Sequence, residues 1–452
     1  MKVNVAGAGA GKTTTMAERI SELEIPEGKI VFCIAFTNAA ADNIEEKVEK
    51  NLGQVPGNIK ISTIHAFLNQ ELIRPYYYFL YGQHFERVSV IDLPHKASYR
   101  RAKLSELEKD GILHQTLIPE KAKYVAYKRS IDKKAHRDTR HKLMSCFSDY
   151  CAAIFVDEAQ DMDKDVKLVL EALDKAGVDI VLYGDPKQDV RGFGQFRKII
   201  DDTPDTRYIA ESYRCPQIHL NISNIIASED EQQLAAAGNA EGSISIVYES
   251  DVDNNSSFIE DGYFGLKYIS MKRDRFDTHK KRNIDLRFET LRHEVHRAMT
   301  DKWAGKEHDI EINRAAFYIT EKMLESFDSG KDVPDIISGW VDRQAFNRLP
   351  SERFAQMASC FKLNESEIEH GPMVHSIESI KGLEAERCLF ILTTDLAPYL
   401  FQKRNEDNKT SHLLYVALTR SLDHMTIFIT KEVEQEYTRP FIDTFFDSFE
   451  VN

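Results

Sequence analysis

The first residues able to do chemistry stand in the opening stretch of the chain, MKVNVAGAGAGKTTTMAERI. Glycines let backbone N–H groups turn inward around an anionic phosphate, and a helix starting behind them adds favourable dipole charge. The ammonium of Lys12 would reach the β- and γ-phosphates of a nucleotide, and the hydroxyl of Thr13 would bind Mg²⁺. A flexible glycine turn is the alternative, but the strand pattern before the loop and the helical pattern after it argue against that. We therefore predict a phosphate-binding loop made of Ala6, Gly7, Ala8, Gly9, Ala10, Gly11, Lys12, Thr13 and Thr14.

Two carboxylates, Asp157 and Glu158, would supply chemistry that complements this loop. They follow the apolar run 152–156, which predicts a buried strand. A carboxylate at the end of such a strand can hold the Mg²⁺ that Thr13 also contacts, and its neighbour can polarise the attacking water. An acidic helix start, favoured by the helix dipole, is the alternative. Because the loop and the carboxylates serve the same reaction, together they predict nucleotide hydrolysis.

Polar residues that follow three other apolar runs are further candidates. Gln188 comes after the run 179–183, where its amide would sense the γ-phosphate, although a Gly-Asp-Pro turn explains its neighbours equally well. Thr37 and Asn38 come after the run 29–36, where they would point into a ligand crevice or simply cap a helix. Thr63 and His65 lie in a second strand-to-helix junction, and His65 alone is more typical of a structural histidine.

These residues need a sheet whose strands all end at one edge. The near-continuous apolar runs are typical of parallel strands buried on both faces, so the sequence predicts an α/β fold. In the second half we expect mostly helix over 283–365 and a loop over 250–262, which is rich in Asp, Asn and Ser. Further strands are predicted at 208–210, 243–248, 266–271, 388–392 and 425–430, with helices at 218–226 and 412–420.

Bulk composition narrows the class of protein. A chain of 452 residues predicts two to four domains, and no apolar run approaches the length of a membrane span. The six cysteines are scattered without metal-ligand spacing, which favours a reducing compartment and a cytoplasmic protein. The net charge of −14 excludes a protein that coats nucleic acid over its whole surface, but it allows a local basic groove.

One segment departs from this acidic balance. Between Pro94 and Leu143 there are 14 Lys and Arg residues against 6 Asp and Glu residues. Such asymmetry suggests a subdomain facing a polyanion, whereas a solvated helical face or a protein-docking surface is the alternative.

Eight stretches in one order carry a family resemblance: AGAGAGKTTT, AFTNAAADNI, ISTIHAF, IFVDEAQD, YGDPKQDVRGF, ESYRCP, SIKGLE and YVALTR. As a set they resemble the motifs of superfamily 1 helicases of the UvrD/PcrA/Rep type, whose phosphate loop often begins with alanine. The resemblance implies two RecA-like parallel-sheet domains with ATP between them, single-stranded DNA across the top, and small, mostly helical accessory insertions. The implied divisions are a first RecA-like domain at 1–75 and 146–207, a basic insertion at 76–145, a second RecA-like domain at 208–280 and 370–452, and a reduced helical insertion at 281–369.

The resemblance also implies a role for each matching position. Lys12 and Thr13 would bind phosphate and Mg²⁺, Asp157 the metal, Glu158 would be the general base, and Gln188 would couple the γ-phosphate to DNA. Arg214 and Arg420 match arginines that reach the γ-phosphate from the second domain, which ties hydrolysis to closure of the cleft. Tyr213 matches the adenine-stacking aromatic residue and Glu384 the ribose contact. The DNA-side positions are Thr37, Asn38, Thr63, His65 and Phe193, the last as a stacking platform for a base.

Departures from the family pattern leave the output of hydrolysis open. We expect no upstream glutamine motif of the kind that reads adenine in the family, which leaves the choice of nucleotide open. Arg191 stands where the family usually has an aromatic residue, and Glu378 where it usually has a histidine. The stretch ISTIHAFLNQELIRP, especially Glu71 and Ile73 to Pro75, resembles the small helicase-like subunit of the Gabija anti-phage system, which works beside an OLD-family TOPRIM nuclease. One hypothesis is therefore a DNA-stimulated ATPase that translocates 3′ to 5′ on single strands. The other is a DNA-end-sensing regulatory subunit of a nuclease complex that unwinds little or no duplex. A generic P-loop kinase or GTPase would not explain SIKGLE and YVALTR.

Overall fold

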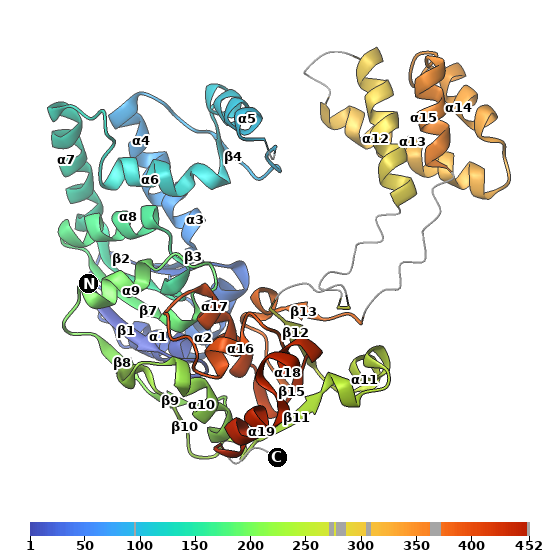
Figure 1. Ribbon diagram of the computed structural model, residues 1–452. Helices are drawn as coiled ribbons and strands as arrows, with labels where there is room; N and C mark the ends of the chain where they lie inside the picture. The colour runs from blue at the N-terminus through green and yellow to red at the C-terminus, as the bar shows by residue number, and fades with distance from the viewer. Residues whose placement is uncertain (95, 271–274, 277–285, 304–308, 362–371, 450–452) are drawn as a thin grey trace. The chain divides into compact units, whose positions relative to one another are not determined.

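The computed structural model describes residues 1–449 except 95, 271–274, 277–285, 304–308 and 362–371. The chain divides into two compact units, one formed by Met1–Met271 with His375–Asn452 and the other by Lys272–Val374 (Figure 1). The first unit contains two large sheets, and the described part of the second unit is helical. No helix in the described ranges is both long and apolar enough to cross a membrane.

The first sheet has six strands in the order β3-β2-β6-β7-β1-β8, and every neighbouring pair is parallel. Parallel neighbours in this order require crossover connections, so consecutive strands are separated by helices. The strands are β1 (Lys2–Ala6), β2 (Ile30–Ala35), β3 (Ile59–Thr63), β6 (Cys151–Val156), β7 (Asp179–Gly184) and β8 (Arg207–Ile209).

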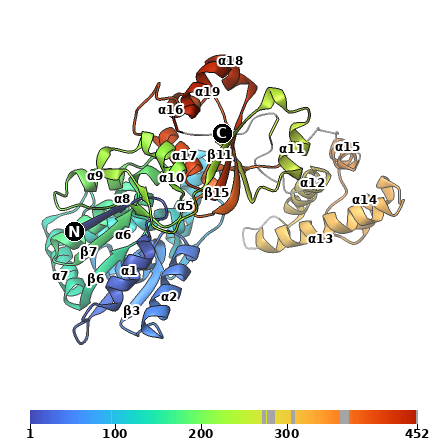
Figure 2. The same cartoon turned by 90° about the horizontal axis from the view of Figure 1, so that it is seen from below.

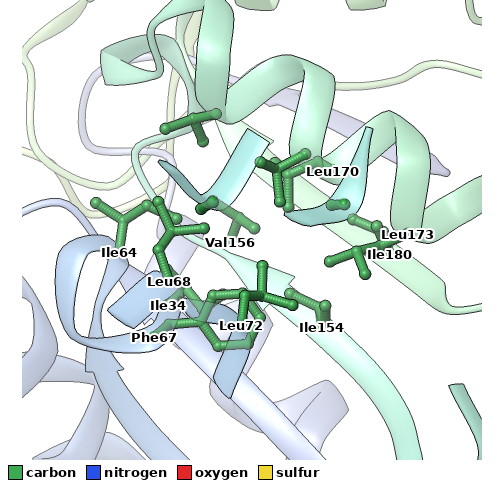
Figure 3. Packing of buried hydrophobic residues seen from close by; sticks show 14 of the residues in the cluster. Ile34, Ile64, Phe67, Leu68, Leu72, Ile154, Val156, Leu170, Leu173 and Ile180 are labelled. Carbon is green, nitrogen blue, oxygen red and sulfur yellow. The ribbon is translucent and has the colours of Figure 1, made fainter. Parts of the chain in front are cut away.

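Both faces of this sheet are buried because successive side chains of each strand point to opposite faces. On one face Cys33, Phe155 and Val181 pack against α1 (Lys12–Ser21) and α2 (Asn38–Leu52). On the other face Ile34 and Ile154 lie with residues of α3 (Ile64–Phe67), the π-helical turn Leu68–Ile73, α8 (Lys164–Lys175) and α9 (Gln195–Asp201). Figure 3 shows part of this second cluster, with Phe67, Leu72 and Leu173 among the side chains packed on the strands.

The segment after α3 extends the same hydrophobic core. Tyr77, Leu113 and Val125 belong to the cluster that covers the first sheet, so this segment packs on that sheet. Its elements are α4 (Arg74–Tyr81), β4 (Arg87–Ser89), α5 (Ala97–Lys109), β5 (Ile112–His114), α6 (Ile118–Ala126) and α7 (Lys134–Tyr150). Inside it, the buried pair Arg140–Asp132 has an Nη2–Oδ2 distance of 2.5 Å, and Tyr81 donates its hydroxyl proton to the same carboxylate.

The second sheet has five parallel strands in the order β11-β15-β14-β12-β13. They are β11 (Ser243–Tyr248), β12 (Leu266–Ile269), β13 (His375–Ser376), β14 (Ala385–Leu392) and β15 (Ser421–Ile429). A separate core cluster joins these strands to α17 (Lys409–Leu418), which is buried on nearly every side. The remaining elements of the unit are β9 (Glu211–Ser212), β10 (Leu234–Ala235), α10 (Gln217–Ser223), α11 (Asn255–Asp261), α16 (Ala397–Leu400), α18 (Lys431–Tyr437) and α19 (Arg439–Asp447).

The second unit is a helical bundle with its own core. Leu291, Val295, Met323 and Ile337 are among its buried residues. Its described helices are α12 (Leu286–Lys302), α13 (Asp309–Asp328), α14 (Val333–Asp342) and α15 (Ser351–Cys360), seen from a second direction in Figure 2.

The α/β fold with two parallel sheets predicted from the sequence is confirmed. The predicted loop over 250–262 is wrong, because α11 lies within it. Asn254 accepts a hydrogen bond from the backbone N–H of Ser257 and so caps α11, whose polar composition had suggested irregular structure. The four-part domain division stays a prediction. The basic residues 272–274 and 280–282 lie outside the described residues.

Candidate nucleotide-binding site

The predicted phosphate loop links β1 to α1 and needs glycine at two points. Gly9 and Gly11 have φ angles of 69° and 71°, the left-handed region that glycine occupies without steric cost. The buried ammonium of Lys12 folds back over the loop and donates to the carbonyl oxygens of Ala6 (3.2 Å) and Gly7 (3.3 Å). These are weak, replaceable partners, so Lys12 is held at the loop without a competing carboxylate bond.

The loop and the first predicted carboxylate are in direct contact. Thr13 Oγ1 donates a hydrogen bond of 2.7 Å to Asp157 Oδ2, and Asp157 Oδ1 accepts one of 2.8 Å from the backbone N–H of Glu158. Burial and the neighbouring Glu158 raise the pKa of Asp157 to about 6, although Thr13 and Lys12 act against the rise. A hydroxyl and a carboxylate side by side are hard oxygen donors of the kind that bind Mg²⁺ together with substrate phosphates. This pair therefore fits the predicted metal, and no cluster of three protein ligands is present in the described residues.

Glu158 occupies a strained position at the end of β6. Its φ is 54°, which is uncommon for a residue with a side chain and is typical of functional sites. Gln160 Nε2 donates to Glu158 Oε2 at 2.5 Å, and Lys381 Nζ lies 3.7 Å from the same oxygen. Burial raises the pKa of Glu158, but Lys12 and Lys381 outweigh it, so the pKa is lowered and the carboxylate stays ionised. An ionised carboxylate is able to accept a proton from water.

The turn after β7 fixes Gln188. The buried carboxylate of Asp185 accepts hydrogen bonds from Gln188 Nε2 (2.9 Å) and from the backbone N–H of Lys187 (3.1 Å). Burial raises the pKa of Asp185, yet Lys187 and Lys12 lower it overall, so Asp185 is charged and holds the Gln188 amide in place. The turn that the Gly-Asp-Pro sequence predicts is therefore present, and its Asp185 also holds the amide of Gln188.

The second half of the chain supplies the opposite side of the site. Arg214 Nε lies 2.5 Å from Glu384 Oε2, so the predicted phosphate and ribose contacts are joined to each other in this structure. Tyr213 donates its backbone N–H to Gly9 O at 2.9 Å, and its exposed ring lies beside Gly11. An exposed aromatic ring above the loop is suited to stacking on a base.

Arg420 is a fully buried arginine, only 1% exposed. Its guanidinium donates to Val416 O (3.0 Å), Leu383 O (3.4 Å) and Thr419 Oγ1 (3.2 Å). Among the described residues it makes no ion pair with a carboxylate, and burial together with Arg214 lowers its pKa. A buried cation without a counter-ion is costly, so its environment is complementary to an anion.

One cavity of about 1030 Å³ collects these groups. Helix α2 and the segment 378–384 also contribute to its wall. Both residues that depart from the family pattern, Arg191 and Glu378, line it, and Glu378 is ion-paired with Lys409. The predicted residues that line the cavity are Gly9, Ala10, Gly11, Lys12, Thr13, Thr37, Asp157, Glu158, Gln188, Phe193, Tyr213, Arg214, Glu384 and Arg420.

The other predicted residues lie away from the cavity lining. Ala6, Gly7, Ala8 and Thr14 belong to the loop but face elsewhere, and Thr14 Oγ1 accepts a hydrogen bond of 2.7 Å from Lys47 Nζ. Asn38 is the first residue of α2, Thr63 is the last residue of β3, and His65 lies in α3. The hydroxyls of Thr37 and Thr63 cap helices by accepting from the N–H groups of Ala40 and Ala66. Thr37 thus confirms the capping alternative while it also borders the cavity.

Several residues at the site were not found from the sequence. Lys381 bonds Asp161 at 2.6 Å and reaches Glu158, and Lys47 lines the cavity from α2. Lys381 stands inside the SIKGLE stretch, so the motif was a usable signal. Gln233 and Tyr415 contact the loop backbone, and Gln233 lies in no recognised stretch.

Comparison with known protein families gives a match in the first part of the chain. Residues 1–194 match the family model of an AAA domain. No curated protein matches the chain. Solved structures that match include an arterivirus nonstructural protein 10, a helicase, alone (12% identity, TM-score 0.37) and in complex with DNA (11% identity, TM-score 0.37). Both alignments cover 94% of this chain, which spans 59% and 60% of those chains. At this level of similarity they carry no argument about activity.

Proposed function

We propose that this chain is an ATPase of the helicase-like kind, which binds Mg²⁺ and ATP in the cavity between its two sheets. The observation that carries the proposal is the hydrogen bond between Thr13 and Asp157 in a cavity that Lys12, Glu158, Arg214 and Arg420 also line. Loop lysine, paired hydroxyl and carboxylate, ionised glutamate and two arginines are the groups that phosphoryl transfer requires. The AAA-domain match over residues 1–194 supports the same reading of the first part of the chain.

In this proposal water attacks the γ-phosphorus of ATP, and the bond to the bridging oxygen breaks to give ADP and phosphate. Glu158 accepts a proton from the attacking water, and its lowered pKa keeps it in the required ionised state. Mg²⁺, when bound, supplies positive charge to the phosphate oxygens. Lys12, Arg214 and Arg420 stabilise the charge that develops on the transferred group, and charge stabilisation of this kind is commonly the largest contribution to catalysis.

We further propose that single-stranded DNA regulates this reaction. Phe193 is 38% exposed beside the cavity, and Gln188 at the preceding turn faces the same space. An exposed phenylalanine is a stacking surface that accepts any base. The basic stretch between Pro94 and Leu143 offers cations for DNA phosphates. The resemblance to superfamily 1 helicases suggests 3′-to-5′ movement along the strand.

A second function, a DNA-end-sensing ATPase within an anti-phage nuclease complex, is favoured by one observation. The ion pair of Glu378 with Lys409 lines the cavity at the position where the family usually has histidine. A change at this surface alters how hydrolysis is coupled to DNA and leaves hydrolysis itself in place. The partner in this version is a nuclease of the OLD family.

Hydrolysis of ATP measured with and without single-stranded DNA tests the proposal. The wild-type protein should hydrolyse ATP with Mg²⁺, and DNA should raise the rate. Lys12→Ala and Glu158→Gln should abolish turnover while the thermal unfolding temperature stays near that of the wild type. Absence of hydrolysis in a folded wild-type protein would contradict the ATPase proposal. Failure to unwind a tailed duplex, together with co-purification of a nuclease, would select the second function.

A further inference from the structure

Both backbone polar groups of one phosphate-loop residue, Ala8, are bonded by side chains from the later part of the chain. The N–H of Ala8 donates to the hydroxyl of Tyr415 at 3.0 Å. The carbonyl oxygen of Ala8 accepts from Gln233 Nε2 at 3.0 Å and from Ser212 Oγ at 2.8 Å. In the sequence Ala8 follows Ala6 and Gly7, whose carbonyl oxygens accept from Lys12, and precedes Gly9, which has a left-handed backbone. The hydrogen bonds of the Ala8 backbone therefore set the path of the loop.

The side chains of Tyr415 and Gln233 also bond each other, which closes a ring of hydrogen bonds with Ala8. Tyr415 donates its hydroxyl proton to Gln233 Oε1 at 2.6 Å. Because the Ala8 N–H can only donate, the Tyr415 oxygen must accept there and pass its own proton onward, which fixes the orientation of the Gln233 amide. Tyr415 is 0% exposed and Gln233 is 1% exposed, so water does not compete for these bonds. Burial, and next the Asp185 carboxylate, raise the pKa of Tyr415 well above its usual value, so the hydroxyl keeps its proton.

Two glycines of the loop leave the space that these side chains occupy. A Cβ placed on Gly7 would lie 2.1 to 2.5 Å from the amide atoms of Gln233. A Cβ on Gly9 would lie 2.4 Å from Arg214 Cβ and 2.9 Å from Ser212 Oγ. Gly7 does not have a positive φ, so its missing side chain is required by Gln233 and not by the backbone conformation. The loop therefore carries glycine partly to receive residues from the second half of the chain.

Gln233 and Tyr415 are each held in place by the later part of the chain, and the helix that carries Tyr415 also holds Arg420. Gln233 is locked by Asn224, which accepts from its N–H and donates to its carbonyl oxygen, each at 2.9 Å. Tyr415 lies on α17, whose last turn offers the Val416 carbonyl that holds Arg420. A movement of α17 therefore acts on the phosphate loop through Tyr415 and on the buried arginine through Val416.

We infer that Gln233 and Tyr415 are positioning residues that clamp the backbone N–H and C=O of Ala8 in the phosphate loop to α17 and thereby fix the loop relative to Arg420. The inference rests on the proposed function, because the clamp serves nucleotide hydrolysis. Neither residue touches the reacting atoms. Their contribution is to keep the loop and the arginine in one arrangement, which preorganises the charges that meet the triphosphate.

Three variants of the full-length protein test the clamp. Tyr415→Phe removes the hydroxyl and keeps the ring, Gln233→Leu removes the amide, and the double variant removes both. Tyr248→Phe is the matched control, since that tyrosine is also buried, donates to Asp443 at 2.5 Å, and lies outside the cavity lining. The readouts are hydrogen exchange of the Ala8 amide and kcat and KM for ATP with Mg²⁺, in protein whose thermal unfolding shows a folded state.

The clamp predicts that either variant speeds exchange at Ala8 at least tenfold and lowers kcat/KM at least tenfold, whereas Tyr248→Phe changes neither by more than about twofold. Because one ring is broken in each case, the double variant should lose no more than about threefold beyond the worse single variant. In addition, Arg420→Ala should cost less in the Tyr415→Phe background than in the wild type. That coupling would not arise from a loss of stability alone.

Unchanged exchange at Ala8 in both variants, or losses that multiply in the double variant, would overturn the clamp. If the wild-type protein hydrolyses no nucleotide, the proposed function fails, yet exchange at Ala8 still decides whether the clamp exists. If Tyr415→Phe does not fold, Gln233→Leu supplies the same measurement.

Discussion

At the scale of single residues, the site separates two neighbouring carboxylates into different roles. Asp157 is buried against Thr13 and has a raised pKa, whereas Glu158 faces Lys12 and Lys381 and has a lowered pKa. Opposite shifts in adjacent groups are the usual sign of divided roles in catalysis. Asp157 is thus suited to a cation that would neutralise it, and Glu158 to proton transfer.

The hydroxyl of Thr13 gives a conservative test of this division. Thr13→Val keeps the shape but removes the bond to Asp157, so Mg²⁺-dependent hydrolysis should fall by about 100-fold or more. Thr13→Ser keeps the hydroxyl and should retain activity within roughly tenfold of the wild type. Steady-state rates over a Mg²⁺ series measure both variants. Equal losses in the valine and serine variants would contradict a role for the hydroxyl.

Arg420 should act on the reaction more than on substrate binding. Its guanidinium is buried without a carboxylate partner in the described residues, so an anion is its expected counter-charge. Arg420→Lys and Arg420→Ala should lower kcat by about 1,000-fold or more, as loss of an arginine does in related phosphoryl transfer, while KM for ATP changes only a few-fold. Turnover by Arg420→Ala within threefold of the wild type would count against this assignment.

At the scale of elements, the phosphate loop meets its packing partners through glycines rather than through side chains. The crowding between Gly7 and Gln233 predicts that Gly7→Ala destabilises the protein, typically by 1 to 3 kcal/mol for an overpacked buried site. Shortening the partner by Gln233→Ala removes the clashing atoms, so the double variant should recover much of the loss. Urea unfolding of the two single variants and the double variant measures the recovery. Gly57→Ala is the control, because nothing lies within 4 Å of the added carbon and Gly57, like Gly7, has no positive φ.

The start of α17 should make stability depend on pH. His412 contacts the Asp407 carboxylate at 2.5 Å and the Asp189 carbonyl oxygen at 3.0 Å. Burial lowers the pKa of His412, but the bond to Asp407 outweighs it and the pKa is raised. A raised histidine pKa stabilises the fold fully below the unfolded value near 6.5, and this contribution is lost as pH rises through the folded value.

His412→Gln should remove that dependence. Between pH 6 and pH 8.5 the free energy of unfolding of the wild type should fall relative to the variant by about 1 kcal/mol, the net contribution of a typical intramolecular hydrogen bond. Urea unfolding at the two pH values measures the difference. A wild-type curve parallel to that of His412→Gln would show that the histidine is not charged in the fold.

The elements also show what the sequence could and could not predict. Most strands of the two sheets and the loop residues Lys12 and Thr13 were predictable, because apolar runs and glycine spacing are local signals, whereas the two-residue strand β13 was not predicted. Gln233 was not, since its role depends on contact with a loop residue that lies 225 positions away in the sequence. Helix α11 was missed because a polar segment capped by Asn254 has the same composition as a loop.

At the scale of the whole molecule, the first unit contains two large parallel sheets, and the candidate nucleotide cavity is lined by residues from the N-terminal and the C-terminal part of this unit. Residues far apart in the sequence are joined by the ion pairs Lys381–Asp161 and Arg197–Glu231. The hydrogen-bonded ring of Ala8, Tyr415 and Gln233 is a further connection. A small change in the distance between the sheets would therefore alter several contacts around the cavity together, as in enzymes where closure completes the site.

The proposed binding of single-stranded DNA is also tested at the scale of the whole molecule. Lys96 and Lys128 lie over the rings of Tyr99 and Tyr127, at 5.0 and 4.9 Å, so cations and aromatic rings alternate on this basic segment. Lys96→Glu with Lys128→Glu should weaken binding of single-stranded DNA and reduce its salt dependence by about one unit of slope per lost phosphate contact. Lys175→Glu, an exposed change outside the segment, is the control. If the wild type, the double variant and Lys175→Glu have the same DNA affinity and the same salt slope, this surface does not bind DNA.

A structure of the full-length protein with Mg²⁺ and a non-hydrolysable ATP analogue tests the central claim most directly. The account predicts Thr13 and Asp157 beside the metal, with the γ-phosphate in reach of Lys12 from one side and Arg420 from the other. A triphosphate bound outside this cavity, or bound in it with Arg420 still bonded to its present carbonyl partners and away from the phosphates, would contradict the account.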